Sequence, residues 1–386
     1  MANIKETLLS TLVNGKTVLA DIKAIRRNAQ DKIYVGNEPE ERINKLHPAY
    51  TSVTVNEIID TKKDAKIYRL TSDNNYLPPF EAGQYINIFI TIDNVLTSRP
   101  YSISSSPKQR SYYEITVARQ KDGFVSPYIL DNIKVGDKLY LNGPNGTFRY
   151  QGVFHKKSSV FLAGGSGITP FMSMSREILL SNMDRQVTLI YGVRKEKFAL
   201  FHKELTEYNK IYNNFKYYLV VSDDENYEGE KGFINKELIT RLVPNYKDST
   251  FYISGPEIMN NFCKMELEAL GLTTKQIRRE MFGSVLDITK QEGYPNNVKP
   301  TDVFKVKVND QIIDAKANES LLTALERSGV KVKVSCRCGE CSYCRIRLIK
   351  GNVFMAKGMN LRDADLEFKY VHACKSFPIE DLEIRV

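Results

Sequence analysis

The chain has 386 residues and a formal net charge of +9 at neutral pH. That length is too great for one typical domain and predicts two or three. Basic and acidic residues are mixed along the chain, which argues against nucleic-acid binding, and no run of about twenty apolar residues predicts a membrane span.

The cysteines bear on the cellular compartment. Five of the six lie at or after residue 336, which is not the pattern of a secreted disulfide framework. The chain does not open with the charged, apolar and cleavage-site pattern of a secretory signal. We therefore expect a cytoplasmic protein.

Residues 1–52 form an N-terminal extension to which the sequence assigns no role. Apolar residues recur in it at a spacing that a helix could accommodate, and a polar stretch follows. It could be a packing appendage or an arm that contacts a partner. The apolar residues are Leu8, Leu9, Leu12, Val18, Leu19, Ile22 and Ile25.

Residues 53–152 contain short runs rich in β-forming residues, at 85–90, 113–117 and 138–141, separated by Pro and Gly. This rhythm predicts a small antiparallel β-barrel. It contains Arg99-Pro100-Tyr101-Ser102, in which a guanidinium could grip a phosphate, a phenol ring could lie on a flat heterocycle and a hydroxyl could bond a ring nitrogen. An edge strand with a surface arginine is the alternative.

Residues 153–285 alternate strands with helices, which predicts a parallel sheet with crossover helices. A buried strand at 160–163 leads into Gly164-Gly165-Ser166-Gly167-Ile168-Thr169-Pro170 and then a helix. Such a turn can present backbone N–H groups to a pyrophosphate, although it could also be only a tight connection. The run 251–259 repeats the arrangement with Ser254-Gly255-Pro256, and both turns are expected to line one crevice beyond the ends of the strands.

Residues 286–300 are poor in apolar side chains and predict a linker. Beyond it, Cys336, Cys341, Cys344 and Cys374 have the plant-type spacing of a [2Fe–2S] cluster. A zinc site or a disulfide pair is the alternative. Cys338 would break the spacing and is expected not to be a ligand. None of the four histidines is required, and His372 is expected to be a loop residue.

The segment 301–386, with a strand pattern at 303–308 before the cysteine loop, resembles plant-type ferredoxins, which implies an α+β β-grasp domain. The barrel motif, the GGSGITP turn and the SGP-x-x-M turn, in that order, resemble the ferredoxin–NADP reductase superfamily. The whole chain from about residue 53 is similar to oxygenase reductases of the phthalate dioxygenase reductase type and to hybrid cluster protein reductases.

This resemblance implies roles for individual residues. Arg99 would contact the flavin phosphate, Tyr101 would stack on the isoalloxazine and Ser102 would bond near its N5. Ser254 stands where the family commonly has Cys. A hydroxyl would then replace a thiol that helps to position the nicotinamide, and we expect this departure to affect the rate of hydride transfer. The other implied positions are Gly123 and Ser126 at a flavin pyrophosphate; Gly164, Gly165, Gly167, Thr169 and Pro170 at the nicotinamide dinucleotide, with Ser254, Gly255, Pro256 and Met259 opposite; and Phe282, preceded by Glu280, close to the flavin.

The resemblance implies a reductase in which hydride passes from NAD(P)H to flavin and single electrons then pass through the [2Fe–2S] cluster to a redox protein partner. FAD is favoured over FMN, and NADH over NADPH. A free flavin or ferric reductase, a non-catalytic iron–sulfur redox sensor and a zinc-stabilised binding module are the alternatives. Residues 301–386 carry 15 Lys or Arg and 12 Asp or Glu, which predicts a partner surface that is neutral or acidic.

Overall fold

The computed structural model describes residues 11, 14–28, 38–61, 64–281, 287–356 and 361–386. The chain divides into two units, residues 1–48 and 49–386. In the first unit the structure has two helices, α2 (Gly15–Asn28) and α3 (Glu38–Leu46). Helix α2 contains Val18, Leu19, Ile22 and Ile25 of the apolar series, whereas Leu8, Leu9 and Leu12 lie outside the described residues.

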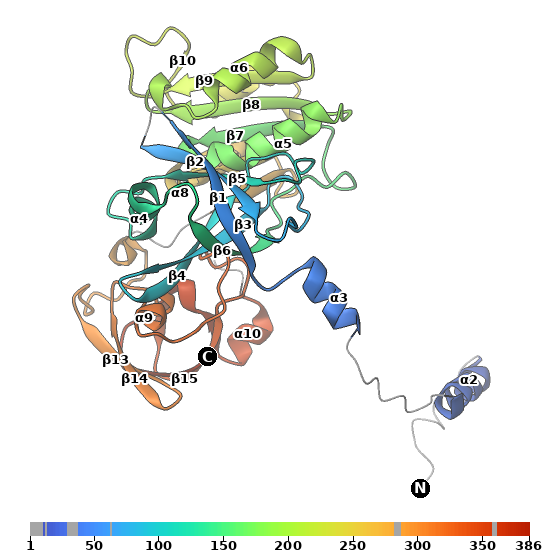
Figure 1. Cartoon of the computed structure of the whole chain (residues 1–386), viewed down its shortest axis with the longest axis vertical. Helices are drawn as coiled ribbons and strands as arrows, with labels where there is room; N and C mark the ends of the chain where they lie inside the picture. Colours follow the sequence, from blue (N-terminus) through green and yellow to red (C-terminus); the bar gives the residue numbers. More distant parts are fainter. Residues whose placement is uncertain (1–10, 12–13, 29–37, 62–63, 282–286, 357–360) are drawn as a thin grey trace. The chain divides into compact units, whose positions relative to one another are not determined.

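The second unit begins with an antiparallel sheet in the order β4-β3-β6-β1-β2-β5, which curls into the predicted barrel (Figure 1). Alternate residues of β3 face the barrel core, where Ile86, Ile88 and Ile90 are buried. The elements are β1 (Thr51–Asp60), β2 (Ala65–Ser72), β3 (Tyr85–Ile92), β4 (Val95–Ser102), β5 (Tyr113–Ala118), α4 (Val125–Asn132) and β6 (Lys138–Asn145).

A parallel sheet in the order β10-β9-β8-β7-β11-β12 follows. Its elements are β7 (Ser158–Gly164), η1 (Gly165–Ile168), α5 (Thr169–Leu180), β8 (Gln186–Val193), η2 (Glu196–Phe198), α6 (His202–Ile211), β9 (Phe215–Val221), β10 (Glu230–Lys231), α7 (Lys236–Leu242), η3 (Tyr246–Asp248), β11 (Ser249–Ser254), α8 (Glu257–Ala269) and β12 (Ile277–Glu280).

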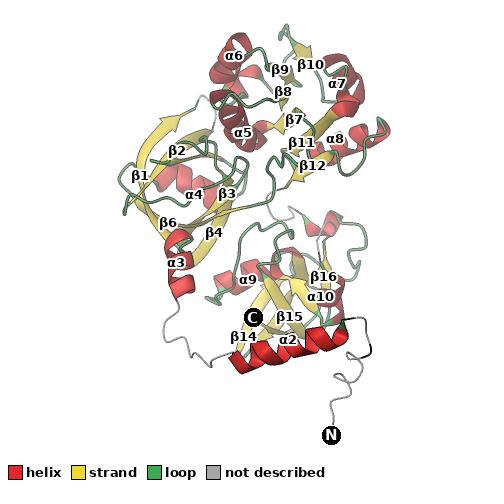
Figure 2. Cartoon of the chain, turned by 90° about the vertical axis from the view of Figure 1, so that its right-hand side faces the viewer, coloured by secondary structure: helices red, strands yellow, loops and turns green. Residues whose placement is uncertain are grey.

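Helices cover both faces of this parallel sheet (Figure 2). Phe161 and Ala163 of β7 pack on one side with residues of α5 and α6, while Val160 and Leu162 pack on the other with residues of α7 and α8. A strand buried on both faces needs apolar side chains at every position, which explains the continuous apolar run from 160 to 163.

The rest of the unit is an α+β domain in which α9 packs against a mixed sheet of order β14-β13-β19-β15-β17, beside a small β16-β18 ladder. Its elements are β13 (Val303–Val308), β14 (Gln311–Lys316), α9 (Leu321–Arg327), β15 (Arg345–Lys350), β16 (Val353–Met355), α10 (Asp363–Glu367), β17 (Tyr370–His372), η5 (Ala373–Lys375), β18 (Ser376–Pro378) and β19 (Leu382–Arg385). Before it, η4 (Ile288–Lys290) inserts Ile288 against Ala356 and Phe377.

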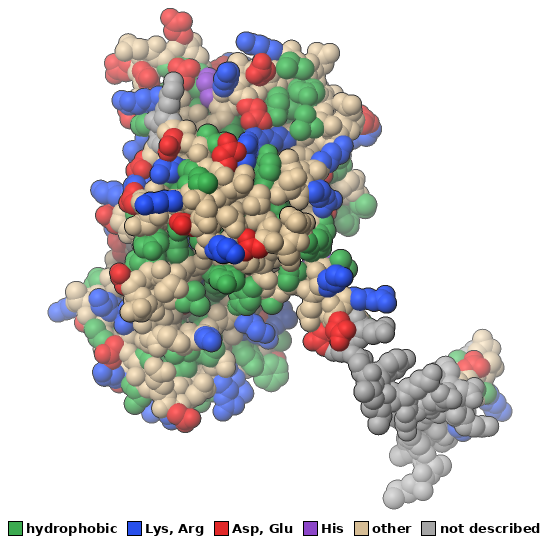
Figure 3. Space-filling view, in the orientation of Figure 1, with side chains coloured by type: hydrophobic (Ala, Val, Ile, Leu, Met, Phe, Trp, Pro, Cys, Tyr) green, Lys and Arg blue, Asp and Glu red, His purple; other side chains and the backbone are tan. Residues whose placement is uncertain are grey.

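In the part of the chain that the structure describes, no helix combines the length and the apolar character that crossing a membrane requires. On the face shown in Figure 3, basic and acidic side chains are interspersed. The fold class is as predicted: an antiparallel barrel, a parallel α/β domain and an α+β domain.

Candidate functional site

Strand β4 carries the Arg-Pro-Tyr-Ser motif to the edge of the barrel sheet. Arg99 donates from Nη1 to Thr97 Oγ1 at 2.9 Å and to the Ser98 carbonyl oxygen at 2.7 Å. Burial, followed by the charge of Arg337, lowers the pKa of Arg99 to about 10. A guanidinium placed in this way still carries its charge at neutral pH and suits a phosphate.

The two glycine turns of the parallel domain meet. A Cβ atom at Gly167 would overlap the Ser254 carbonyl group and lie 2.6 Å from the Gly255 nitrogen, and one at Gly164 would overlap the Met259 sulfur. Because strands β7 and β11 are parallel neighbours, their carboxyl ends bring both turns to the same edge of the sheet. The two turns therefore meet as the sequence predicts, and the crevice that they are expected to line stays a prediction.

Other predicted nucleotide residues shape the same turn. Gly165 adopts a left-handed φ of +53°, and the space where its side chain would lie is open. The Thr169 hydroxyl donates to the Ser166 carbonyl oxygen, and Pro170 stands in the first turn of α5, where its missing N–H costs nothing. The segment η1 replaces the simple turn with one turn of 3₁₀ helix.

Glu280, at the end of β12, joins the barrel to the nucleotide domain. Its Oε2 accepts from Ser102 Oγ at 3.4 Å and from Ser254 Oγ at 3.3 Å, and Asn260 Nδ2 donates to its backbone oxygen at 2.9 Å. Burial raises the pKa of this carboxyl well above its usual range, and Glu340 adds to the rise. A carboxyl whose neutral form is favoured by burial therefore faces two hydroxyls where the predicted flavin motif meets the predicted nucleotide turn.

The sequence did not single out Glu280 as a site residue. The sequence names Glu280 only as preceding Phe282, because its place opposite Ser254 depends on the pairing of β12 with β11. A carboxyl at the end of a strand that neighbours a nucleotide turn is a candidate site residue. The neighbouring Phe282 lies outside the described residues, so its predicted place near the flavin stays a prediction.

The cysteine loop holds its thiols in pairs. Cys336 and Cys341 exchange backbone N–H bonds to each other's sulfur at 3.5 and 3.4 Å, and the thiols of Cys344 and Cys374 hydrogen-bond to each other. All six cysteines of the chain are free of disulfides, and Cys338 is buried beside Cys336. Cysteine sulfurs that accept backbone N–H bonds are the type of ligand that a [2Fe–2S] cluster takes.

The expectation that His372 is a loop residue is wrong. It lies in β17, fully buried, because its strand pairs with β15 through Arg345. Its Nδ1 donates to the Gly339 carbonyl oxygen at 2.9 Å. His372 thereby holds the backbone of the cysteine loop at Gly339, whose φ is +84°.

The cysteine loop docks on the barrel. The Tyr85 hydroxyl lies 2.9 Å from Ser335 Oγ, and Asn87 Nδ2 donates to the same oxygen at 3.3 Å. The Tyr85 ring packs on Cys336 and Cys338, and in the β3–β4 ladder Tyr85 stands opposite Ser102. The thiols and the flavin motif are therefore neighbours across one barrel strand.

The two remaining predicted flavin residues form a turn of their own. The Gly123 N–H donates to the Gln120 carbonyl oxygen at 3.0 Å, and Ser126 Oγ accepts from the Gln120 N–H at 2.9 Å. Ser126 lies in the first turn of α4. In the described residues no hydrogen bond joins Gly123 or Ser126 to Arg99 or Tyr101, so the role of this turn at a pyrophosphate stays a prediction.

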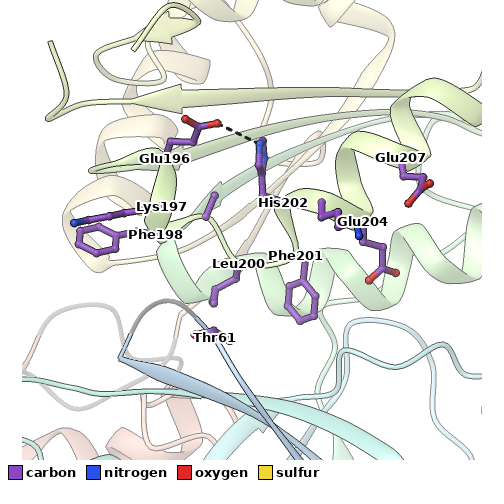
Figure 4. A pocket seen from close by; sticks show the side chains of 11 residues that line it. Thr61, Glu196, Lys197, Phe198, Leu200, Phe201, His202, Glu204 and Glu207 are labelled. Carbon is purple, nitrogen blue, oxygen red and sulfur yellow. Dashed lines mark ion pairs between the residues drawn. The ribbon is translucent and has the colours of Figure 1, made fainter. Parts of the chain in front are cut away.

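A separate pocket of about 650 Å³ follows the end of β8 (Figure 4). Its lining comes from η2, the start of α6 and Thr61, and Glu196 and His202 lie 3.5 Å apart across it. Glu280 and the residues around it do not line this pocket, so the place where the two glycine turns meet is the better candidate for the chemistry.

Three family models match the chain in succession. An oxidoreductase FAD-binding domain matches residues 52–150, an oxidoreductase NAD-binding domain 161–265 and a 2Fe-2S iron-sulfur cluster binding domain 304–378. The chain is 26% identical to the glycine betaine monooxygenase reductase subunit of Pseudomonas aeruginosa, over 88% of this chain and 99% of the relative. It is 29% identical to the NADH oxidoreductase HCR of Escherichia coli K12, over 79% and 88%.

The NADH-cytochrome b5 reductase 1 of Dictyostelium discoideum is 30% identical, over 59% of this chain and 80% of the relative. Among solved structures, phthalate dioxygenase reductase superposes with a TM-score of 0.67 at 23% identity, over 90% of this chain and 99% of that one. The chain therefore belongs to the ferredoxin–NADP reductase superfamily and is an NAD(P)H-dependent oxidoreductase with FAD-binding, NAD-binding and [2Fe–2S] domains.

Proposed function

We propose that this reductase takes hydride from NADH where Ser102, Ser254 and Glu280 meet and delivers single electrons to a redox protein partner. The hydrogen-bonded group around Glu280 is the observation that carries this proposal, since it joins the flavin motif to the nucleotide turn. A bound flavin accepts an electron pair as hydride and passes electrons on singly, which a [2Fe–2S] cluster requires.

Each protein group has a proposed task. Arg99 holds the flavin phosphate, and Tyr101 offers its ring to the isoalloxazine. Ser102 hydrogen-bonds near N5 and, with Ser254, is kept in place by the Glu280 carboxyl. We propose FAD over FMN, with Gly123 and Ser126 at its pyrophosphate, because Ser126 lies in the first turn of α4 and such a turn presents N–H groups to an anion.

The glycine turn at 164–170 and the turn at 254–256, with Met259 against them, hold the dinucleotide in this proposal. The overlap that a side chain at Gly167 would meet supports it, because a turn this tight leaves its backbone N–H groups to a ligand. NADH is proposed over NADPH because two of the similar proteins are named as NADH enzymes. Arg194, Lys195 and Lys197, which are exposed just after β8, could hold a 2′-phosphate and are the argument for NADPH.

The proposed cluster ligands are Cys336, Cys341, Cys344 and Cys374, with Cys338 outside the set. The N–H bonds between Cys336 and Cys341 and the contact between the Cys344 and Cys374 thiols support this set. Cys338 also hydrogen-bonds to Cys336, so only the plant-type spacing sets it apart. Free thiols suit a reducing compartment, and for that reason we propose the cytoplasm as the location.

We also propose domain limits of 53–152 for the flavin barrel, 153–285 for the nucleotide domain and 301–386 for the cluster domain, with a linker at 286–300. Elements support these limits, since β6 ends at Asn145 and β7 begins at Ser158, and β13 begins at Val303. Residues 1–52 stand outside them.

The electron acceptor is proposed to be an oxygenase or a hybrid cluster protein, because similar proteins are named as reductases of a monooxygenase and as HCR. The basic excess of residues 301–386 favours a neutral or acidic docking surface on that partner. If the docking surface is acidic, raising the ionic strength will slow electron transfer to the partner. A rate that rises with salt would contradict the proposed charge of that surface.

Substitution at Cys341 tests the route. We expect Cys341→Ser to lose the cluster and the reduction of a one-electron protein acceptor such as cytochrome c, by at least about tenfold, while NADH-dependent reduction of ferricyanide persists. The buried Cys263, replaced by Ala, is the matched control. If Cys341→Ser lost the cluster and kept both activities, a direct flavin route would be favoured, as in a free flavin or ferric reductase.

A further inference from the structure

The Thr97 hydroxyl joins side chains from two distant parts of the chain. It accepts from Arg99 Nη1 at 2.9 Å and from Arg337 Nη2 at 3.1 Å, and it donates to Glu326 Oε2 at 3.0 Å. Thr97 and Arg99 belong to the barrel strand β4, whereas Glu326 is in α9 and Arg337 follows the first cluster cysteine. We call these four residues the Thr97 network.

Arg337 is an unusual member of a cluster loop, because its side chain is only 7% exposed. Its Nη2 is shared between Thr97 and an ion pair with Glu326. Its Nε is buried without a hydrogen-bond partner among the residues that the structure describes. A buried N–H group without a partner is costly, so a ligand that could accept from this guanidinium is expected nearby.

The charge of the Thr97 network points the same way. Arg99 and Arg337 bring two positive charges. The positive charge of Arg337 disfavours the charged form of Arg99, and the negative charge of Glu326 favours it. Glu326 is a single carboxylate with a side chain 11% exposed. One positive charge is left over in a largely buried place, where an uncompensated charge is unfavourable.

We propose that Arg337 is a second positioning residue for the flavin phosphate, which it reaches from the cluster loop and shares with Arg99 across Thr97. This inference rests on the proposed function, in which Arg99 binds that phosphate. Its consequence is reciprocal: binding of flavin and docking of the cluster loop on the barrel strengthen each other. The order of assembly would then be controlled by one anion.

The test compares two flavins that differ only in the phosphate. Flavin-depleted full-length protein and its Arg337→Gln variant are titrated with FMN and with riboflavin, and binding is followed by quenching of flavin fluorescence. We expect the Kd for FMN to rise about tenfold in Arg337→Gln and the Kd for riboflavin to change less than twofold. Arg337→Lys, which keeps the charge, should stay closer to the parent protein.

Equal weakening of both flavins would assign Arg337 to packing alone and overturn the proposal, as would an unchanged Kd for FMN. Because Arg337 adjoins Cys336, the barrel variants Thr97→Val and Thr97→Ser provide an independent arm. Thr97→Val should weaken FMN selectively and change the visible circular dichroism of the cluster, while Thr97→Ser, which keeps the hydroxyl, should do neither. FMN binding by Thr97→Val that matches the parent would also overturn the proposal.

The same titration separates this inference from the proposed function. Parent protein that binds neither of these flavins, and does not bind FAD in the same titration, would refute the proposed function. Parent protein that binds FMN as tightly as Arg337→Gln does would refute only the role of Arg337.

Discussion

Glu280 shows how one side chain can combine the work of two domains. Its carboxyl accepts hydrogen bonds from Ser102 of the barrel and Ser254 of the nucleotide domain while being almost fully buried. Burial keeps it protonated at pH values where a surface glutamate is charged. It can therefore hold or release a proton next to the place proposed for hydride transfer.

The first prediction concerns stability and pH at Glu280. Folding raises the pKa of this carboxyl. Below its pKa in the unfolded chain, about 4.3, the carboxyl is neutral in the folded and the unfolded protein alike. As the pH rises from about 4.3 toward the pKa in the folded protein, the free energy of unfolding falls. Glu280→Gln removes that cost, by about 1.4 kcal/mol for each pH unit in this window. In urea unfolding at pH 4 and pH 8, the free energy of unfolding of Glu280→Gln should exceed that of the parent protein only at pH 8.

Glu207, a carboxylate at the mouth of the pocket after β8, provides the matched control, since Glu207→Gln should give no such gain. A Glu280→Gln variant that loses stability equally at both pH values would show that folding does not raise the pKa of this carboxyl.

Ser254 is the second residue to test, because it stands where the resemblance leads us to expect Cys. Its hydroxyl bonds Glu280 at 3.3 Å. We expect Ser254→Ala to slow reduction of the flavin by NADH about tenfold, with little change in the Kd for NADH, since its hydroxyl is bonded to Glu280 and the backbone of the turn is left to the dinucleotide. Stopped-flow measurements separate the two, and Ser254→Cys should restore most of the rate. A change in Kd alone would make Ser254 a binding residue.

At the scale of elements, the glycine turns follow from the parallel sheet. Gly167 lies against the backbone of Ser254 and Gly255, whereas Gly165 has open space but a left-handed backbone. The first glycine is needed for close approach of two turns and the second for its conformation.

These two glycines predict different outcomes. Gly167→Ala should push the turns apart, lowering the melting temperature and raising KM for NADH at least about tenfold, because the overlapping atoms belong to the backbone and have nowhere to move. Gly165→Ala should cost only about 1 kcal/mol of backbone strain. Thermal unfolding and steady-state kinetics of both variants check this, and similar KM values in the two would refute the argument from close approach.

The local elements could be predicted from the sequence because their signals are local. The apolar run at 160–163, the glycines after it and the Pro in the first turn of α5 each follow from short-range physics, and the strand at 303–308 likewise. The short 3₁₀ segment η1 and strand β17, which holds His372, depend on tertiary pairing and were not predicted.

At the scale of the whole molecule, the cofactor domains could be predicted from motif order, but their junction could not. The bonds from Tyr85 and Asn87 to Ser335, and the Thr97 network, join residues more than 200 positions apart, and no spacing rule encodes such contacts. Glu280 was missed for the same reason, since its partner Ser102 lies 178 residues away. The site becomes a single redox path only when these contacts are known.

The most direct test of the central claim is an anaerobic titration of the purified protein with NADH, followed by visible absorption and electron paramagnetic resonance. The account predicts bound flavin together with iron and inorganic sulfide, bleaching of the flavin, and the signal of a reduced [2Fe–2S] cluster that is absent in Cys341→Ser. Protein that holds flavin and is reduced by NADH while its cluster stays oxidised, or protein that holds neither cofactor, would contradict the account.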